Sequence, residues 1–343
     1  MVKQKKVDLN EPIDEKAKPT LSKSELKPEL SEAALTLHGD YYRQLQSKCN
    51  RYIFWHTRSI GLMMVILVCY LSYLMYDYVI ISDSIREFTK LVLNNKFDFI
   101  NIFPCLILTF SCIGTAGYFI SDEFRGISDD LLKPNYIEEI FGFDLKKYSK
   151  LTNAKTPKET KFKLTNSKNS QLIIYRDSPI AVVTLKPLIE NSTESNFFIK
   201  ITGLNVRKVF QKVDFDTLLI ETAILRSREL FQEYVDGKKI KDVDGCKINI
   251  LIDAYSFDTD LIKTLTKNSF GLIKKDYNLN FFQANNDDKL LKLVSYKSVH
   301  QFFEISKNTY GLTLLAKNED QDLILKTSKN YLNNDDQSTK KRR

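Results

Sequence analysis

The sequence predicts an α+β protein in which a transmembrane helical hairpin precedes a mixed-sheet domain on the cytosolic side of the membrane. Two uncharged apolar runs begin near residues 60 and 100, and about two thirds of the 343 residues follow them. That length is sufficient for one globular domain with its own core. Within it, strand-like and helix-like patterns alternate.

The part of the chain before the first apolar run divides at residue 31. Residues 1–30 mix Lys, Glu, Asp, Pro and Ser with few apolar positions, so we expect a disordered tail. Residues 31–59 place leucine and aromatic side chains among polar ones, and Ser31 with Glu32 is suited to starting a capped helix. We expect this segment to be a juxtamembrane helix.

Residues 60–81 and 100–121 are the predicted transmembrane helices. Each segment has about the 20 residues needed to cross a hydrocarbon core of about 30 Å. The first is uncharged from Ile60 to Tyr76, and we expect Asp77 to lie near one interface. The link at 82–99 is short, so the helices form a hairpin that leaves both termini on one side. Positive charges are somewhat more numerous before the first run than in the link, which favours cytosolic termini.

Polar and small residues recur at helical spacing on both predicted spans. Such faces pack against other helices. Two interpretations stay open: the two spans pack on each other, or part of this surface contacts a polytopic client while the client folds. The residues concerned are Tyr70, Tyr73, Asp77, Ser111, Gly114 and Thr115.

Residues 122–330 are expected to form the cytosolic domain, with a hairpin turn at Asp177-Ser178-Pro179. Alternating apolar residues predict strands and a 3.6-residue period predicts helices. The expected strands cover 171–175, 180–185, 197–206, 246–254, 279–282 and 290–296, and the expected helices cover 215–235 and 259–267.

This order of elements resembles the core of the GNAT acetyltransferase superfamily over about residues 130–310. A membrane hairpin before such a core resembles the endoplasmic-reticulum acetyltransferases. Members of the superfamily hold the coenzyme A pyrophosphate at a helix N-terminus, on a loop of pattern (Gln or Arg)-x-x-Gly-x-(Gly or Ala). Here the loop reads Gln211-Lys212-Val213-Asp214-Phe215-Asp216.

Asp214 and Asp216 replace both small residues of that pattern. Their side chains fill the space a phosphate needs and oppose its charge, so we expect no bound cofactor. We expect the two carboxylates to cap the helix instead, each contributing about 0.5–1 kcal/mol. The resemblance also implies a tyrosine general acid before a Gly-Phe pair, where this chain has Leu265 and Ser269-Phe270. The domain is therefore predicted not to be an enzyme.

No other catalytic or metal-binding set can be assembled from the sequence. The histidines are dispersed, the cysteines lack metal-binding spacing, and His300 is expected to be structural. Asp253 and Asp258 could be paired carboxylates, but we interpret them as surface turn residues. The histidines are His38, His56 and His300.

Basic residues at the two ends supply seven positive charges, against a net charge of +8, so no patch for nucleic acid remains in the domain. In the tail at 331–343, Lys340 and Lys341 stand fourth and third from the end, the spacing of a cytosolic dilysine retrieval signal. Such signals are read by a receptor and are not anchors. The alternative is a solvated basic tail.

The whole arrangement resembles a family of fungal endoplasmic-reticulum chaperones that package the high-affinity inorganic phosphate transporter. The resemblance rests on the segment at 30–35, Asp40-Tyr41-Tyr42-Arg43 before Trp55, the hairpin and the domain size. It implies a two-pass endoplasmic-reticulum membrane protein with both termini cytosolic. A polytopic phosphate transporter would be its client, and vesicle coat and retrieval machinery would be its other partners.

Such a chaperone would promote folding and vesicle packaging of the transporter and would be needed only indirectly for phosphate uptake. The alternative is a membrane-bound acetyl-CoA-dependent N-acetyltransferase with an unusual cofactor loop. A third class, a tether or subunit of a transporter complex, would remain with its partner after export. A retrieval signal at Lys340 and Lys341 argues against that third class.

Overall fold

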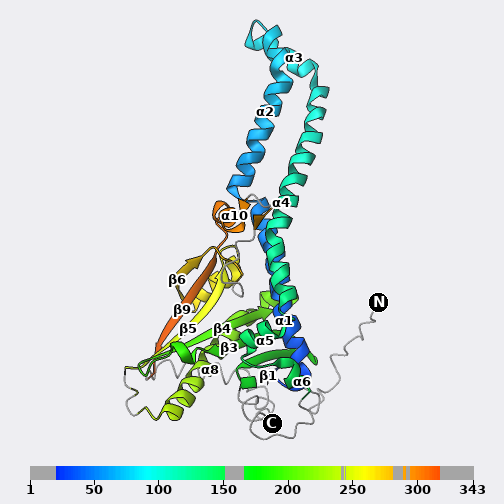
Figure 1. Ribbon diagram of the computed structural model, residues 1–343. Helices are drawn as coiled ribbons and strands as arrows, with labels where there is room; N and C mark the ends of the chain where they lie inside the picture. Colours follow the sequence, from blue (N-terminus) through cyan, green and yellow to red (C-terminus); the bar gives the residue numbers. More distant parts are fainter. Residues whose placement is uncertain are drawn as a thin grey trace, which may run out of the picture.

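The computed structural model describes residues 21–150, 166–240, 243, 245–280, 289–290 and 294–316 (Figure 1). Two long helices rise from a body that contains the sheet, and a short helix joins them at the far end. The predicted α+β class with a mixed sheet is confirmed.

The hairpin and its stalk are helical almost throughout. At the break between the first two helices, His56 has an extended backbone and its Nδ1 accepts a hydrogen bond of 3.2 Å from the Arg58 N–H. His56 thus caps the second helix, and the predicted juxtamembrane helix ends at Phe54 instead of residue 59. The elements are α1 (Ser31–Phe54), α2 (Thr57–Ile81), α3 (Ile85–Asn94), η2 (Lys96–Asn101) and α4 (Ile102–Asp130).

Among the described residues, α2 and α4 are the helices long and apolar enough to cross a membrane. In the most apolar 18-residue segment of each helix, only 6% of α2 and 17% of α4 is buried within the protein. α4 continues past the predicted end at residue 121 because Phe124 and Ile127 are fully buried against the domain. One continuous helix therefore connects the hairpin to the domain core.

The sheet has seven described strands in the order β1-β2-β3-β4-β5-β9-β6. Neighbours are antiparallel except β4 and β5, which are parallel and connected through α8. The pairing of β4 with β5 ends at Ile201 and Ile252, although both strands continue. The strands are β1 (Leu21–Glu25), β2 (Ser170–Tyr175), β3 (Ser178–Pro187), β4 (Asn196–Val206), β5 (Lys247–Tyr255), β6 (Gly271–Asp276) and β9 (Lys307–Leu315).

Helices cover both faces of the sheet and create two cores. One core packs α8 and α9 on the inward residues of β3, β4 and β5, including Val183, Ile199 and Ile250. The other packs α1, α4, α5 and α6 on the opposite face. The remaining elements are η1 (Pro28–Leu30), α5 (Pro134–Phe141), α6 (Leu145–Ser149), η4 (Ile189–Asn191), η5 (Lys208–Val213), α8 (Phe215–Lys238), α9 (Thr259–Lys267), β7 (Lys289–Leu290), β8 (Val294–Ser295) and α10 (Tyr296–Phe302).

The expected strands up to residue 254 and both expected helices are found within a few residues of their predicted bounds. The β2–β3 turn lies one residue earlier than predicted. Arg176 and Asp177 both have left-handed backbones, with φ of 48° and 62°. A two-residue turn of this kind matches the twist of the strands that it joins.

The expectations for the C-terminal strands were wrong in part. No strand includes Leu279 or Asn280, the described part of the strand expected at 279–282. Leu279 is buried, and its carbonyl accepts a hydrogen bond of 3.2 Å from the Tyr255 hydroxyl. The edge strand is β6 instead. Of the strand expected at 290–296, Leu290 and Val294–Ser295 belong to the short β7–β8 ladder and Tyr296 begins α10.

Regular structure also occurs earlier in the chain than we predicted. β1 lies within the expected tail at 1–30 and pairs with β2 along its whole length. Its backbone hydrogen bonds stabilise it despite a polar composition. Ser31 is the first residue of α1, not its cap, and its hydroxyl donates to the Lys27 carbonyl at 3.3 Å.

Candidate functional site

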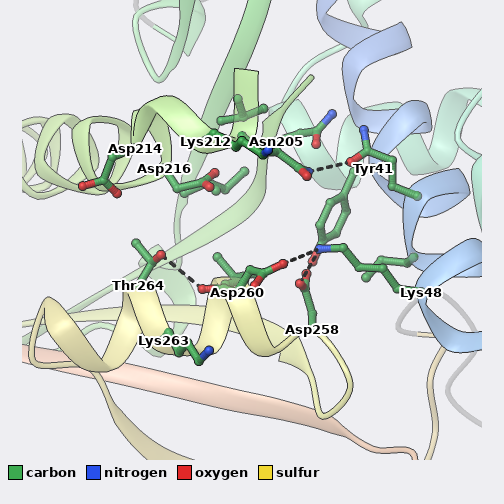
Figure 2. Close-up of a pocket in the computed structure, with 16 residues that line it drawn as sticks. Tyr41, Lys48, Asn205, Lys212, Asp214, Asp216, Asp258, Asp260, Lys263 and Thr264 are labelled. Atoms are coloured by element: carbon green, nitrogen blue, oxygen red, sulfur yellow. Dashed lines mark hydrogen bonds and ion pairs between the residues drawn. The ribbon is translucent and has the colours of Figure 1, made fainter. Parts of the chain in front are cut away.

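A cavity of about 460 Å³ opens where β4 and β5 separate. The end of β4, the η5–α8 turn and the start of α9 form its walls, and α1 closes it (Figure 2). The four residues of the expected degenerate coenzyme loop, Gln211, Lys212, Asp214 and Asp216, all line it. The other lining residues include Tyr41, Gln44, Lys48, Asn205, Asp258, Asp260, Lys263 and Thr264.

The cavity contains a buried ion pair that joins α1 to the α9 turn. Lys48 Nζ lies 2.7 Å from Asp258 Oδ1 and 3.8 Å from Asp260 Oδ2 (Figure 2). The Asp258 side chain is only 2% exposed and the Lys48 side chain 30%. Our interpretation of Asp258 as a surface turn residue was therefore wrong, because a cation from α1 allows this carboxylate to be buried.

Asp253 does not pair with Asp258. It lies on β5, where Lys200 Nζ is 2.8 Å from its Oδ2 and the Thr309 hydroxyl donates to its Oδ1 at 2.7 Å. Each aspartate thus has its own cation. The two carboxylates act separately in holding neighbouring elements together.

Asp214 and Asp216 lie at the start of α8, but they do not cap it as we expected. Asp214 has a left-handed backbone with φ of 60°, which turns its side chain away from the helix N–H groups. The Thr217 hydroxyl donates to its Oδ1 at 2.8 Å, and Lys267 Nζ lies 3.3 Å from its Oδ2. Asp216 faces the cavity from the first turn.

The environment of Asp216 is acidic on balance, because four aspartates and three lysines line the cavity. The pKa of its carboxyl is raised to about 6, mainly by burial and next by the charge of Asp258, while Lys48 acts in the opposite direction. The side chain therefore carries an incompletely compensated charge near neutral pH. An anionic ligand would meet three other carboxylates here, those of Asp214, Asp258 and Asp260.

The residues present do not fit a coenzyme A pyrophosphate. Acidic side chains occupy the loop that should offer bare backbone N–H groups. In addition, Gln211 Nε2 donates to Gln44 Oε1 at 2.9 Å, so α1 is tied to the same loop. At the position of the implied general acid, Leu265 is fully buried and Ser269 has a left-handed backbone.

The histidines are separated, and two of them are buried. His38 Nε2 lies 3.0 Å from the Thr184 hydroxyl beneath the sheet, and burial lowers its pKa to about 4. His300 lies in α10, and burial lowers its pKa to about 4. No cluster of His, Cys, Asp or Glu in the described ranges could hold a metal ion.

The hairpin residues separate into two sets. The Tyr70 hydroxyl donates a hydrogen bond of 3.0 Å to the Asn101 carbonyl, so this side chain connects α2 to the start of α4. Tyr73 is 77% exposed, and Asp77, Ser111 and Thr115 are also exposed. The remaining residue, Gly114, has open space where a Cβ would be. Lys340 and Lys341 lie outside the described residues.

Sequence reasoning did not identify the contribution of α1 to the cavity. Lys48 is 210 residues from Asp258, and Gln44 is 167 residues from Gln211. The available signal was the spacing of apolar residues in this segment, where Leu37, Leu45 and Cys49 recur at a helical period and are buried in the structure. That pattern indicates a helix packed in a core, not one that only leads to a membrane.

Comparison with solved structures finds acetyltransferase folds at low similarity. Naa50 from Arabidopsis thaliana matches at 10% identity and a TM-score of 0.29, over 47% of this chain and 84% of that chain. Ard1 from Thermoplasma volcanium matches at 10% and 0.28, over 55% and 95%. IAA acetyltransferase from Bacillus cereus matches at 11% and 0.27, over 46% and 85%. These values carry no argument about activity.

Comparison with protein sequences gives a different kind of match. No curated protein matches the chain. A family model described as the inorganic phosphate transporter chaperone Pho86 matches residues 3–314, which include the hairpin and every described element of the sheet except the end of β9.

Proposed function

Since the chain belongs to the Pho86 family of inorganic phosphate transporter chaperones, we propose that it helps a polytopic phosphate transporter fold and enter transport vesicles. The family match over residues 3–314 is the observation that carries this proposal. The chaperone would be a two-pass protein of the endoplasmic-reticulum membrane with both termini in the cytosol. It would support phosphate uptake indirectly, without moving phosphate itself.

The exposed apolar surface of α2 and α4 supports a membrane location. Val65, Val68 and Ile80 of α2 and Phe103 and Leu108 of α4 are all more than half exposed. An apolar surface of this length is unfavourable in water, whereas a hydrocarbon core solvates it. The first charges beyond the two runs mark where each helix would leave the bilayer.

The outward side of the hairpin is the proposed client surface. Tyr70 is engaged within the hairpin, so the exposed Tyr73 and Asp77 are better placed to meet a transmembrane segment of the client. Ser111 and Thr115 are exposed on α4. Polar side chains in a bilayer form hydrogen bonds with neighbouring helices, which would hold an incompletely folded transporter.

Crosslinking can test this surface directly. A photoreactive residue at Tyr73 should capture newly made phosphate transporter, whereas the same residue at Tyr70 should capture mainly α4 of its own chain. Capture of α4 from both positions and of no transporter would support the other interpretation, in which the spans only pack on each other.

The cytosolic domain is proposed to be a scaffold with a GNAT-like sheet and no cofactor. The cavity at the separated ends of β4 and β5 favours the alternative, a membrane-bound N-acetyltransferase, but its four carboxylates outnumber its three lysines and therefore oppose an anionic cofactor. Calorimetry of the full-length protein with acetyl-coenzyme A should detect no tight binding. Tight binding that is lost in a Lys48→Met variant would instead establish a cofactor site in this cavity.

After export of the client, Lys340 and Lys341 would return the chaperone to the endoplasmic reticulum through the retrieval machinery. The coat of the transport vesicle and this machinery are the remaining proposed partners. A tether or transporter subunit would need no such signal.

A further inference from the structure

Exposed aromatic side chains surround the foot of the hairpin. Trp55 is 61% exposed, Phe119 58%, Phe302 55% and Tyr118 45%. They come from three places in the sequence: the α1–α2 junction, α4 and α10. Aromatic residues of this kind are enriched where membrane proteins cross the headgroup layer, because the rings are apolar while the edges of Trp and Tyr can be hydrated.

α10 is held at this place by both long helices, and it lies beside the start of α2 (Figure 1). The Arg58 guanidinium of α2 is 5.0 Å from the centroid of the Phe302 ring, and its Nη2 is 3.1 Å from Glu304 Oε1. On the other side, His300 Nε2 lies 3.4 Å from Glu123 Oε2 of α4. Burial lowers the pKa of His300 to about 4, so near neutral pH this is a packing contact of an uncharged ring and not an ion pair. An element more than 170 residues away in sequence is thus in contact with both helices.

The two contact points lie at the charged ends of the apolar runs. Arg58 is the last charged residue before the run that starts at Ile60, about 3 Å away along the helix at about 1.5 Å per residue. Glu123 follows the run of α4 within two residues of Ser121. α10 therefore lies at the level where hydrocarbon gives way to headgroups, if the hairpin spans a bilayer.

Charge attraction is not the main contribution at this surface. Arg58 is already paired with Glu304, and Lys297 is the exposed lysine of α10, whereas several exposed rings are present, so the rings supply most of the contact. Burial of aromatic area in the interface does not require anionic lipid. Zwitterionic phospholipid is therefore a sufficient partner.

We infer that α10 lies in the cytosolic headgroup layer and anchors the domain to the bilayer through Phe302, an inference that rests on the proposed membrane span. The anchor sets the direction of the sheet. Tyr255 of β5 pairs with Lys307 of β9 just after α10, and Lys247 pairs with Leu315 at the other end. Those strands lead away from α10 for about 26 Å at about 3.3 Å per residue.

Tryptophan fluorescence can test the anchor, because Trp55 is the only tryptophan of the chain. A Trp55→Phe protein would receive one new tryptophan, at Phe302, at Tyr73 or at Ile189. Tyr73 is the control within the span. Ile189 is the control far from α10, because it lies in η4 just before β4 and is 57% exposed. Each full-length protein would be placed in phosphatidylcholine vesicles with or without bromine near the headgroup end of the acyl chain.

The fraction of tryptophan fluorescence that brominated lipid quenches should agree within about a factor of two between the Phe302→Trp and Tyr73→Trp proteins, as expected for a ring in the interface. The Ile189→Trp protein should keep its fluorescence. If Tyr73→Trp is quenched and Phe302→Trp is not, the anchor is wrong while the span stands. If neither is quenched, the membrane span fails and the anchor fails with it. Because Phe302 is exposed, the added ring volume should leave the thermal midpoint unchanged.

Discussion

The buried pair between Lys48 and Asp258 gives a quantitative prediction about how the hairpin is joined to the domain. A Lys48→Met substitution keeps the apolar stem and removes the ammonium group. Asp258, 2% exposed and 2.7 Å from that group, would then be a buried carboxylate next to Asp260. Removing one partner of a buried pair costs about 3–5 kcal/mol.

We expect the lower end of this range, about 3 kcal/mol, because water reaches the 30% exposed side chain of Lys48. For a domain of this size the loss corresponds to a fall in thermal midpoint of about 6–12 °C, at about 2–4 °C per kcal/mol. The assay is thermal unfolding of the purified full-length protein in detergent, followed by the fluorescence of Trp55 at the end of α1.

Lys263 provides a matched control in the same cavity. It is exposed, so Lys263→Met should change stability by no more than about 0.5 kcal/mol. Equal midpoints for the two variants would refute the argument that Lys48 compensates a buried charge.

Three other predictions follow from the structure. Gly203→Ala would place a methyl group in the imidazole of His38 and should cost about 1–3 kcal/mol, which His38→Ala should largely restore in a double-mutant cycle. Burial lowers the pKa of His38 and His300 from 6.5 to about 4; the unfolded chain then binds more protons below pH 6.5, so their contribution to stability is complete above 6.5 and lost toward 4. As the pH is lowered from 6.5 to 4, the thermal midpoint should therefore fall, and it should fall less steeply in a His38→Gln protein. A midpoint that stays constant over this pH range would contradict this reasoning. Replacing Lys340 and Lys341 with serine should release the protein from the endoplasmic reticulum in fluorescence microscopy, and an unchanged location would remove the retrieval proposal.

Local patterns were enough to predict the apolar helices and the central sheet. Uncharged runs near residues 60 and 100 indicate α2 and α4, since few other structures need so many consecutive apolar residues. Alternating residues such as Ile248, Ile250 and Ile252 indicate β5, whose inward side chains are buried.

The elements that were missed are stabilised by distant partners. β1 is a polar segment whose strand conformation depends on pairing with β2, about 150 residues later. β9 was not predicted at all, although it lies between β5 and β6 in the sheet. β1 carries little local signal, because the backbone ladder and not the side-chain pattern holds it. β9 does have alternating apolar residues, and its Tyr310 and Leu314 are buried in the core, so this pattern was available and was missed.

Only the loop of the candidate site could be predicted from the sequence, and the residues that α1 contributes could not. The acidic loop at Asp214 and Asp216 was evident as a departure from the glycine pattern of the superfamily that it resembles. Its pairing partners were not, because Lys48 and Gln44 belong to a helix that we expected only to lead to the membrane. The expected caps failed because the left-handed backbone of Asp214 directs its carboxylate toward Thr217 and Lys267.

The most direct test of the chaperone proposal is to delete the gene in its native host and locate the plasma-membrane phosphate transporter while measuring phosphate uptake. We predict that the transporter is retained in the endoplasmic reticulum, that uptake falls, and that the intact protein restores both. Normal export of the transporter in the deletion strain would contradict the proposed function.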